Sequence, residues 1–138
     1  MRAHPLLLVA LGGATGSLVR HGVTSTTLRE SIAIFLLNVV GSLALGAMAA
    51  WLQHAESPLL GVAREASGHW AALLGLGFCG GLTTFSTHMV DVAQRLDSSS
   101  WTGALLSLLG TTAVAIAAAG IGYEAVRRTV QPSAAGAR

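Results

Sequence analysis

The chain contains 138 residues, of which 52% are hydrophobic and only 10% are charged. This composition, with a mean hydropathy of +0.64, excludes an ordinary soluble globular domain and indicates one domain that lies in a membrane. All eight basic residues are arginines, found mainly at the chain ends and between the apolar segments. That distribution is typical of the flanks of membrane helices and excludes nucleic acid as a partner.

Four apolar stretches are each long enough to cross a bilayer core of roughly 30 Å as a helix. They cover residues 5–23, 31–52, 68–92 and 101–126, and the loops 24–30, 53–67 and 93–100 hold most of the remaining charge. Pro5 suits a first helical turn, and Ser31 is predicted to cap the second helix. Residues 1–128 are predicted to form a single four-helix transmembrane domain, and the polar residues 129–138 a disordered tail.

The first segment is predicted to be a membrane helix and not a cleaved signal peptide. Met1 and Arg2 followed by apolar residues are similar to a signal peptide, but the stretch continues through a glycine-rich face, Gly12 to Gly16, and three further apolar segments follow. Small residues let helices approach closely in lipid. Arg20, near the end of this helix, is predicted to place its guanidinium in the headgroups or in a vestibule.

Asn38 is a polar residue inside the second segment, followed by Gly41, Ser42 and Gly46. Two interpretations of its amide remain open. It is an interhelical hydrogen-bonding group, or its NH₂ group donates to an anion in a pore.

The third segment is the least regular, because Gly80 and Gly81 are followed by two threonines, Phe85, and a Ser-Thr pair in mid-membrane. This run predicts a broken helix, which exposes carbonyl groups to a hard cation and N–H groups to an anion. The alternative is a regular helix in which Gly77 and Gly81 form a packing face. Cys79 lies in this segment without a partner in its own chain, so the sequence excludes an intrachain disulfide.

Polar side chains continue beyond the predicted break. Ser86, His88 and Asp91 do not form a hydrolase triad, because residues so close along one helix cannot stack as nucleophile, base and orienting group. A proton relay from His88 to Asp91 stays open. In the fourth segment, Ser107 and Thr111 are four residues apart and share one helix face.

The arginine count is compatible with both orientations in the membrane. Four helices place the termini and the second loop on one side, with five arginines there against three on the other side. Omitting the terminal Arg138 leaves four against three. Four short helices with little polar content cannot enclose a wide aqueous pathway alone, so the sequence predicts an oligomer.

The third segment resembles the signature of the Fluc (CrcB) family of bacterial fluoride channels. The matching run is Gly80-Gly81-Leu82-Thr83-Thr84-Phe85-Ser86-Thr87. Three further features agree in order and position: Gly12-Gly13-Ala14-Thr15-Gly16 with Arg20, Asn38-Val39-Val40-Gly41-Ser42 with Gly46, and the acid Asp91. The similarity spans nearly the whole chain.

This resemblance implies an all-α membrane protein with a broken third helix, which forms an antiparallel, dual-topology dimer in the lipid of the bacterial plasma membrane. Two narrow fluoride pores would run along the subunit interface, and a structural sodium ion would lie at its centre. The backbone carbonyls of Gly80 and Thr83 match the family's sodium ligands, and carbonyl oxygens suit a hard cation.

For fluoride, the resemblance implies a path lined by aromatic ring edges, an asparagine amide and hydroxyl groups. Phe85 and Asn38 match the family pattern directly, and Ser107 and Thr111 are candidates for the hydroxyl groups. Arg20 would sit in a vestibule and concentrate anions.

The chain departs from the family at His88, which occupies the position of the usual second pore phenylalanine, and at Asp91, which replaces the usual glutamate. Protonated His88 would attract fluoride and slow its release, so the substitution predicts a conduction more pH-dependent than with phenylalanine there. The chain is alternatively one half of a heterodimer, whose paralogous subunit supplies the missing phenylalanine.

The sequence therefore predicts a non-enzymatic protein, a channel for passive fluoride export, acting as a homodimer or a heterodimer. The alternative is a proton-coupled exporter similar to the small multidrug transporters. Those carry an acidic residue in the first helix, and this chain has none before Glu30. A structural subunit without transport activity is the third option.

Overall fold

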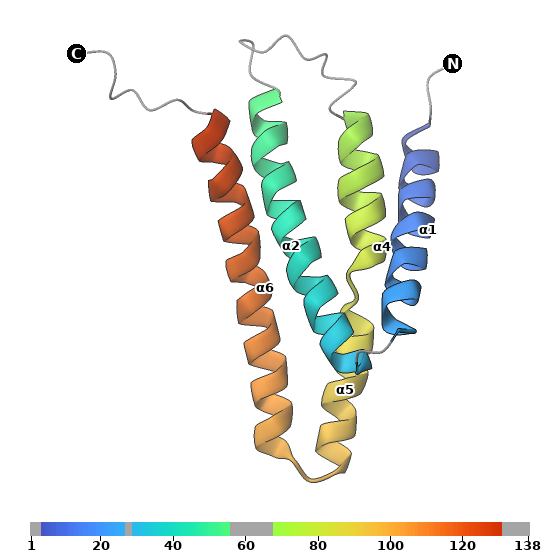
Figure 1. Cartoon of the computed structure of the whole chain (residues 1–138), viewed down its shortest axis with the longest axis vertical. Helices are drawn as coiled ribbons and strands as arrows, with labels where there is room; N and C mark the ends of the chain where they lie inside the picture. Colours follow the sequence, from blue (N-terminus) through green and yellow to red (C-terminus); the bar gives the residue numbers. More distant parts are fainter. Residues whose placement is uncertain (1–3, 27–28, 56–67, 131–138) are drawn as a thin grey trace, which may run out of the picture.

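The structure is a computed structural model and describes residues 4–26, 29–55 and 68–130. All of its regular elements in these ranges are helices (Figure 1). In chain order they are α1 (Pro5–Thr24), α2 (Glu30–Ala55), η1 (Ala71–Cys79), α4 (Gly80–Leu82), α5 (Phe85–Asp97) and α6 (Trp101–Val130). Four helical spans are long and apolar enough to cross a membrane, so the predicted all-α fold with four transmembrane helices is confirmed.

The helices pair along their lengths. Helix α2 packs against α6, while α1 packs against η1 and α4, and α5 turns toward α6 (Figure 1). Small side chains make up much of the buried interior, among them Ala33, Ala50, Ala104 and Ala118. Most of the exposed large side chains are aliphatic, as expected for surfaces that face lipid tails, where close backbone contact stabilises the helix pairs.

Glycines bring α1 and the third span into direct backbone contact. A Cβ atom added to Gly77 would lie 2.9 Å from the Cα atom of Gly12, and one added to Gly81 would lie 3.0 Å from the Cα atom of Gly13. Any larger side chain at these positions would push the two helices apart. The glycine packing face predicted as an alternative to a broken helix is therefore present together with the break.

The third span is interrupted between α4 and α5. Helix η1 has the wide turns of a π-helix, and α4 ends at Leu82. The next residue, Thr83, has an extended backbone with ψ 147°. Thr84 is also extended, with φ −145° and ψ 119°, and α5 starts at the next residue. Paired glycines followed by two β-branched threonines have low helix propensity, and the predicted broken third helix is confirmed.

Three helix ends differ from the prediction. Helix α5 continues to Asp97, five residues beyond the predicted limit, because it leaves the apolar layer as an amphipathic helix with an Arg95–Asp91 ion pair. Helix α2 starts at Glu30, so Ser31 lies inside the first turn and does not cap it. Helix α6 extends to Val130, and residues 56–67 and 131–138 lie outside the described part of the chain.

Helix α1 begins at the same end of the bundle as α6 finishes, and the α5–α6 turn lies at the opposite end (Figure 1). This arrangement agrees with a chain that crosses the membrane four times.

Candidate functional site

The break in the third span is held by the side chain of Asn38 on α2. Its Oδ1 accepts a hydrogen bond from the Thr84 amide at 2.8 Å, and its Nδ2 donates to the Thr84 carbonyl at 3.1 Å. One amide side chain thus forms hydrogen bonds with both the backbone N–H and the backbone carbonyl of Thr84, a residue outside any helix. Backbone groups at membrane depth must be hydrogen-bonded in this way, because no water is available there. The hydrogen-bonding interpretation of Asn38 is confirmed, and its NH₂ group carries a second N–H.

Two side chains of α1 donate hydrogen bonds to backbone carbonyls at the C-terminal end of α4. Ser17 donates to the Gly81 carbonyl and Arg20 Nη1 donates to the Thr83 carbonyl, each at 3.5 Å. A helix C-terminus carries partial negative charge, so the guanidinium stabilises it. Arg20 therefore lies beside the break and is only part-buried, and the vestibule role predicted for it stays a prediction.

Thr84 forms the amino end of α5. Its hydroxyl accepts a hydrogen bond from the Thr87 amide at 3.4 Å and lies 3.1 Å from the hydroxyls of both Ser86 and Thr87. The side chain is only 8% exposed. This is an N-cap, and it turns the positive end of the α5 dipole toward the middle of the membrane span.

A cavity of about 340 Å³ lies next to the break, between α2, α5 and α6. Its lining includes Asn38, Ser42, Thr84, Phe85, His88 and Thr111. We call it the break cavity. Amide, hydroxyl and imidazole groups are gathered here on a largely apolar wall, an arrangement suited to a small polar species.

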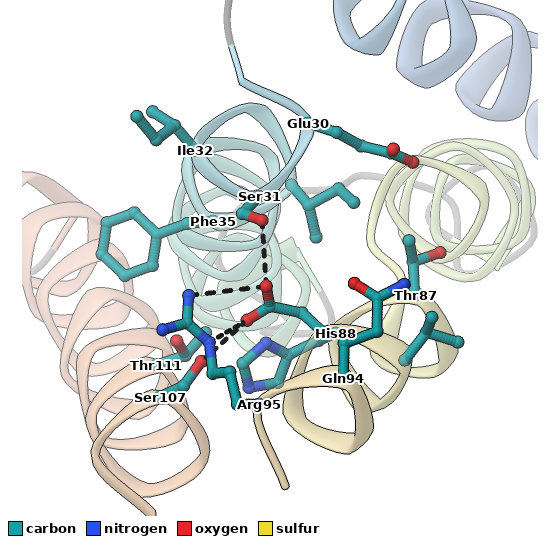
Figure 2. A pocket seen from close by; sticks show the side chains of 13 residues that line it. Glu30, Ser31, Ile32, Phe35, Thr87, His88, Gln94, Arg95, Ser107 and Thr111 are labelled. Carbon is teal, nitrogen blue, oxygen red and sulfur yellow. Dashed lines mark hydrogen bonds and ion pairs between the residues drawn. The ribbon is translucent and has the colours of Figure 1, made fainter. Parts of the chain in front are cut away.

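A second cavity, of about 290 Å³, lies toward the α5–α6 turn, and we call it the polar cavity. Asp91 lines this cavity. Its carboxylate accepts hydrogen bonds from Ser31 at 3.0 Å, from Arg95 Nε at 2.8 Å and from Ser107 at 3.2 Å. Figure 2 shows the side chains of Ser31, Arg95, Ser107 and His88 close together around this cavity. Asp91 thus joins α5 to α2 and α6.

His88 and Thr111 contribute to the linings of both cavities. His88 is only 7% exposed. Its ring centroid lies 6.4 Å from that of Phe85, with the planes tilted by 60°. Phe85 itself is 65% exposed. Of the predicted path residues, Asn38, Phe85, His88 and Thr111 therefore meet at the break cavity, whereas Ser107 belongs to the polar cavity.

The carbonyls of Gly80 and Thr83, predicted to bind sodium, lie at the carbonyl end of α4. In a continuous helix the Thr84 amide would bond to the Gly80 carbonyl, but it donates to Asn38 instead. Gly80 is exposed, and a Cβ atom added there would meet nothing within 4 Å. The Thr83 carbonyl already accepts from Arg20.

Sequence reasoning missed the structural roles of Thr84 and Ser31. A threonine directly before an amphipathic stretch is a helix-start signal that could have identified Thr84 as a cap. The sequence predicts Ser31 as a helix cap, whereas in the structure, where α2 packs against α5, its hydroxyl donates a hydrogen bond to Asp91. Within the part of the chain that the structure describes, no hydrogen bond joins His88 to Asp91, so none supports the proton relay directly.

Comparison with known proteins identifies the family. Residues 7–123 match the family model described as CrcB-like protein, Camphor Resistance (CrcB). A protein of Caulobacter sp. (strain K31) named fluoride-specific ion channel FluC is 36% identical over 128 residues, covering 89% of this chain and 94% of that protein. Proteins of the same name are similar: one from Phenylobacterium zucineum is 34% identical over 128 residues, covering 89% and 95%. FluC 2 of Rhodococcus jostii is 36% identical over 122 residues, covering 86% and 96%. The chain therefore belongs to the CrcB-like family.

Proposed function

We propose that this protein is a multi-pass membrane channel that lets fluoride leave the cell passively. The observation that carries the proposal is the break cavity, where hydrogen-bond donors from three helices face one space in the middle of the membrane span. The relatives named fluoride-specific ion channels support the choice of ion. Helix α1 contains no acidic residue, which gives a proton-coupled exporter of the small multidrug type no support.

The donors around the break cavity would replace the water that surrounds a small, strongly hydrated anion. Asn38 offers its second N–H, Ser42 and Thr111 offer hydroxyls, and Phe85 offers the positive edge of its ring. Because the Asn38 amide is fixed by Thr84, it needs no reorientation when an anion arrives. Ser107 would act nearer the entrance, in the polar cavity.

Fixed positive charge favours an anion at this depth. The amino end of α5 points at the break, and a helix N-terminus acts as roughly half a positive charge. Arg20 adds a full charge beside Thr83. The two together offset part of the cost of bringing an anion into the membrane.

The proposed channel is a dimer, because one subunit leaves part of the path uncovered. Phe85 projects from the subunit surface, and Gly80 lies open beside the break. A second subunit in the opposite orientation would cover this face and contribute its own rings. The partner is a second copy of this chain or a paralogous subunit.

Sodium would be held by the backbone carbonyls of Gly80 and Thr83 from both subunits. The fit rests on two observations: the Gly80 carbonyl has lost its helical donor to Asn38, and its surroundings are open. A bound sodium ion would supply positive charge that binds these carbonyl dipoles. Replacing sodium with N-methylglucamine should lower the dimer's melting temperature in detergent; an unchanged melting temperature contradicts the sodium site.

Fluoride efflux from liposomes tests the proposed function. The purified chain is reconstituted with internal potassium fluoride, and efflux is followed with and without valinomycin. An electrogenic channel shows efflux that requires valinomycin, because potassium must carry the compensating charge. Fluoride efflux that is independent of valinomycin indicates electroneutral exchange and overturns the proposal. Absence of efflux from the single chain overturns the homodimer, and co-reconstitution with a paralogous subunit then tests the heterodimer.

A further inference from the structure

Two acidic side chains line the polar cavity and would repel an anion that entered it. They are Asp91 on α5 and Glu30 at the start of α2. The polar cavity adjoins the break cavity, since His88 and Thr111 contribute to the linings of both. A carboxylate close to a permeating anion raises the energy of that anion, most of all where little water separates the charges. A fluoride path beside Asp91 therefore requires a group that cancels its charge.

Arg95 is the only arginine among the described residues that line the polar cavity, and the chain contains no lysine. Its Nε donates to Asp91 Oδ2 at 2.8 Å, and its Nη2 donates to Asp91 Oδ1 at 3.4 Å. The guanidinium thus contacts both carboxylate oxygens, which fixes the two groups relative to one another. The exposed fraction of the side chain is 43% for Arg95 and 22% for Asp91, so protein surrounds the carboxylate more than it surrounds the arginine.

The other hydrogen-bond partners of Asp91 carry no charge. Ser31 on α2 and Ser107 on α6 donate to the carboxylate at 3.0 and 3.2 Å. Hydroxyl groups orient a carboxylate but leave its net charge in place. Arg20 on α1 lines neither cavity. Arg95 is therefore the arginine placed to compensate Asp91.

Building on the proposed function, we propose that Arg95 is the charge-compensating residue of the fluoride path: its pairing with Asp91 lets an anion pass a carboxylate that joins three helices. Both residues lie on α5, four positions apart, a spacing that brings their side chains together on one helix face. An arginine stays positively charged throughout the working pH range. Without it, the cavity lining would hold two carboxylates and no arginine.

Initial rates of valinomycin-dependent fluoride efflux at low ionic strength test this role. The four proteins compared are wild type, Arg95→Gln, Asp91→Asn and the double variant, each at the same low internal fluoride concentration. Arg95→Gln should lower the rate at least about tenfold, because Asp91 then repels the anion. In the Asp91→Asn background the same substitution should change the rate by no more than about twofold, because the carboxylate is already gone. Asparagine keeps an oxygen that accepts from the serine hydroxyls.

Two further measurements separate charge compensation from a structural effect. Potassium glutamate on both sides of the membrane, raised from about 0.02 to about 0.5 M, should shrink the deficit of Arg95→Gln, because salt screens the exposed carboxylate. A structural defect would persist in salt. Arg95→Lys keeps the positive charge without the guanidinium fork and should retain at least about a third of the wild-type rate.

Arg128→Gln is the matched control, since Arg128 also pairs with an acidic residue four positions away, Glu124, but lines neither cavity. Its efflux should stay within about twofold of wild type. Three results overturn the inference: a wild-type rate for Arg95→Gln, an equal loss in the Asp91→Asn background, or a deficit that salt does not change. Each of them leaves the channel intact. Absence of valinomycin-dependent efflux in wild type overturns the proposed function itself.

Discussion

At the scale of single residues, Asn38 replaces the hydrogen bonds that the broken helix cannot make. Replacing it with alanine leaves the Thr84 amide and carbonyl unpaired inside the bundle. We expect Asn38→Ala to destabilise the protein by about 2 kcal/mol and to reduce fluoride efflux strongly. Thermal unfolding in detergent and liposome efflux measure the two effects.

Thr15→Ala is the matched control for this change. Its hydroxyl bonds only to carbonyls of its own helix, Leu11 and Gly12, on an exposed surface, so stability should change by less than about 0.5 kcal/mol. If both variants melted at the same temperature as wild type, the hydrogen bonds from Asn38 to Thr84 would not be needed to stabilise the break in the third span.

The sequence identified the residues of this site, but it did not identify the groups to which they are hydrogen-bonded. Asn38, Phe85 and the glycine-threonine run were identifiable because polar groups and weak helix formers are rare in an apolar span. The bond from Asn38 to Thr84 joins residues 46 positions apart. Such a pairing depends on how α2 packs on the third span, which local patterns do not encode.

At the scale of the elements, glycines fix the distance between α1 and the third span. A Cβ atom on Gly16 would lie 2.9 Å from the amide nitrogen of Leu82, and backbone cannot move aside cheaply. We expect Gly16→Ala to cost at least about 2 kcal/mol and to lower the yield of monodisperse protein. Gel filtration and thermal unfolding measure the loss.

Gly120→Ala is the control on α6, where an added Cβ atom would meet nothing within 4 Å. This substitution should be neutral or stabilise by up to about 1 kcal/mol. Equal losses for the two variants would argue against close packing of α1 as the cause.

Asp91 joins three helices near the α5–α6 turn. Asp91→Ala removes the acceptor for Ser31, Arg95 and Ser107 at once. We expect a loss of about 1–3 kcal/mol and more rapid hydrogen exchange at this end of α5. Asp97→Ala on the same helix alters an exposed end residue and should change stability by less than about 0.5 kcal/mol. A neutral Asp91→Ala would mean that the three helices are held together without this carboxylate.

The end of α5 shows that the length of an apolar stretch does not determine where a helix ends. The predicted third span stopped at residue 92 because polar residues follow it, but the helix continues to Asp97. Its outer turns are stabilised by the Asp91–Arg95 pair, which hydropathy does not register. The amphipathic pattern of residues 85–97 was available as a signal, since His88 and Val92 lie on its buried face.

At the scale of the whole molecule, charge does not select one orientation. Among the arginines of the described residues, Arg20, Arg29 and Arg95 lie toward one end of the bundle, and Arg127 and Arg128 lie at the other. Because the two ends carry similar numbers of arginines, the positive-inside rule does not favour one orientation strongly. A homodimer of opposed subunits would require this balance, because copies of the same chain would have to insert in both orientations.

Labelling of a single cysteine tests this dual topology. In a Cys79→Ala background, Ser98→Cys places one thiol in the exposed α5–α6 turn. A membrane-impermeant maleimide added to intact cells should label about half of the chains, because near-equal charge at the two ends gives both orientations similar insertion energies. Disruption of the cells should then allow the other half to react. Labelling of nearly all chains, or of almost none, before disruption would establish a single orientation and exclude the antiparallel homodimer. Adding two arginines next to Ser98 should shift the labelled fraction toward zero, since that end is then retained inside.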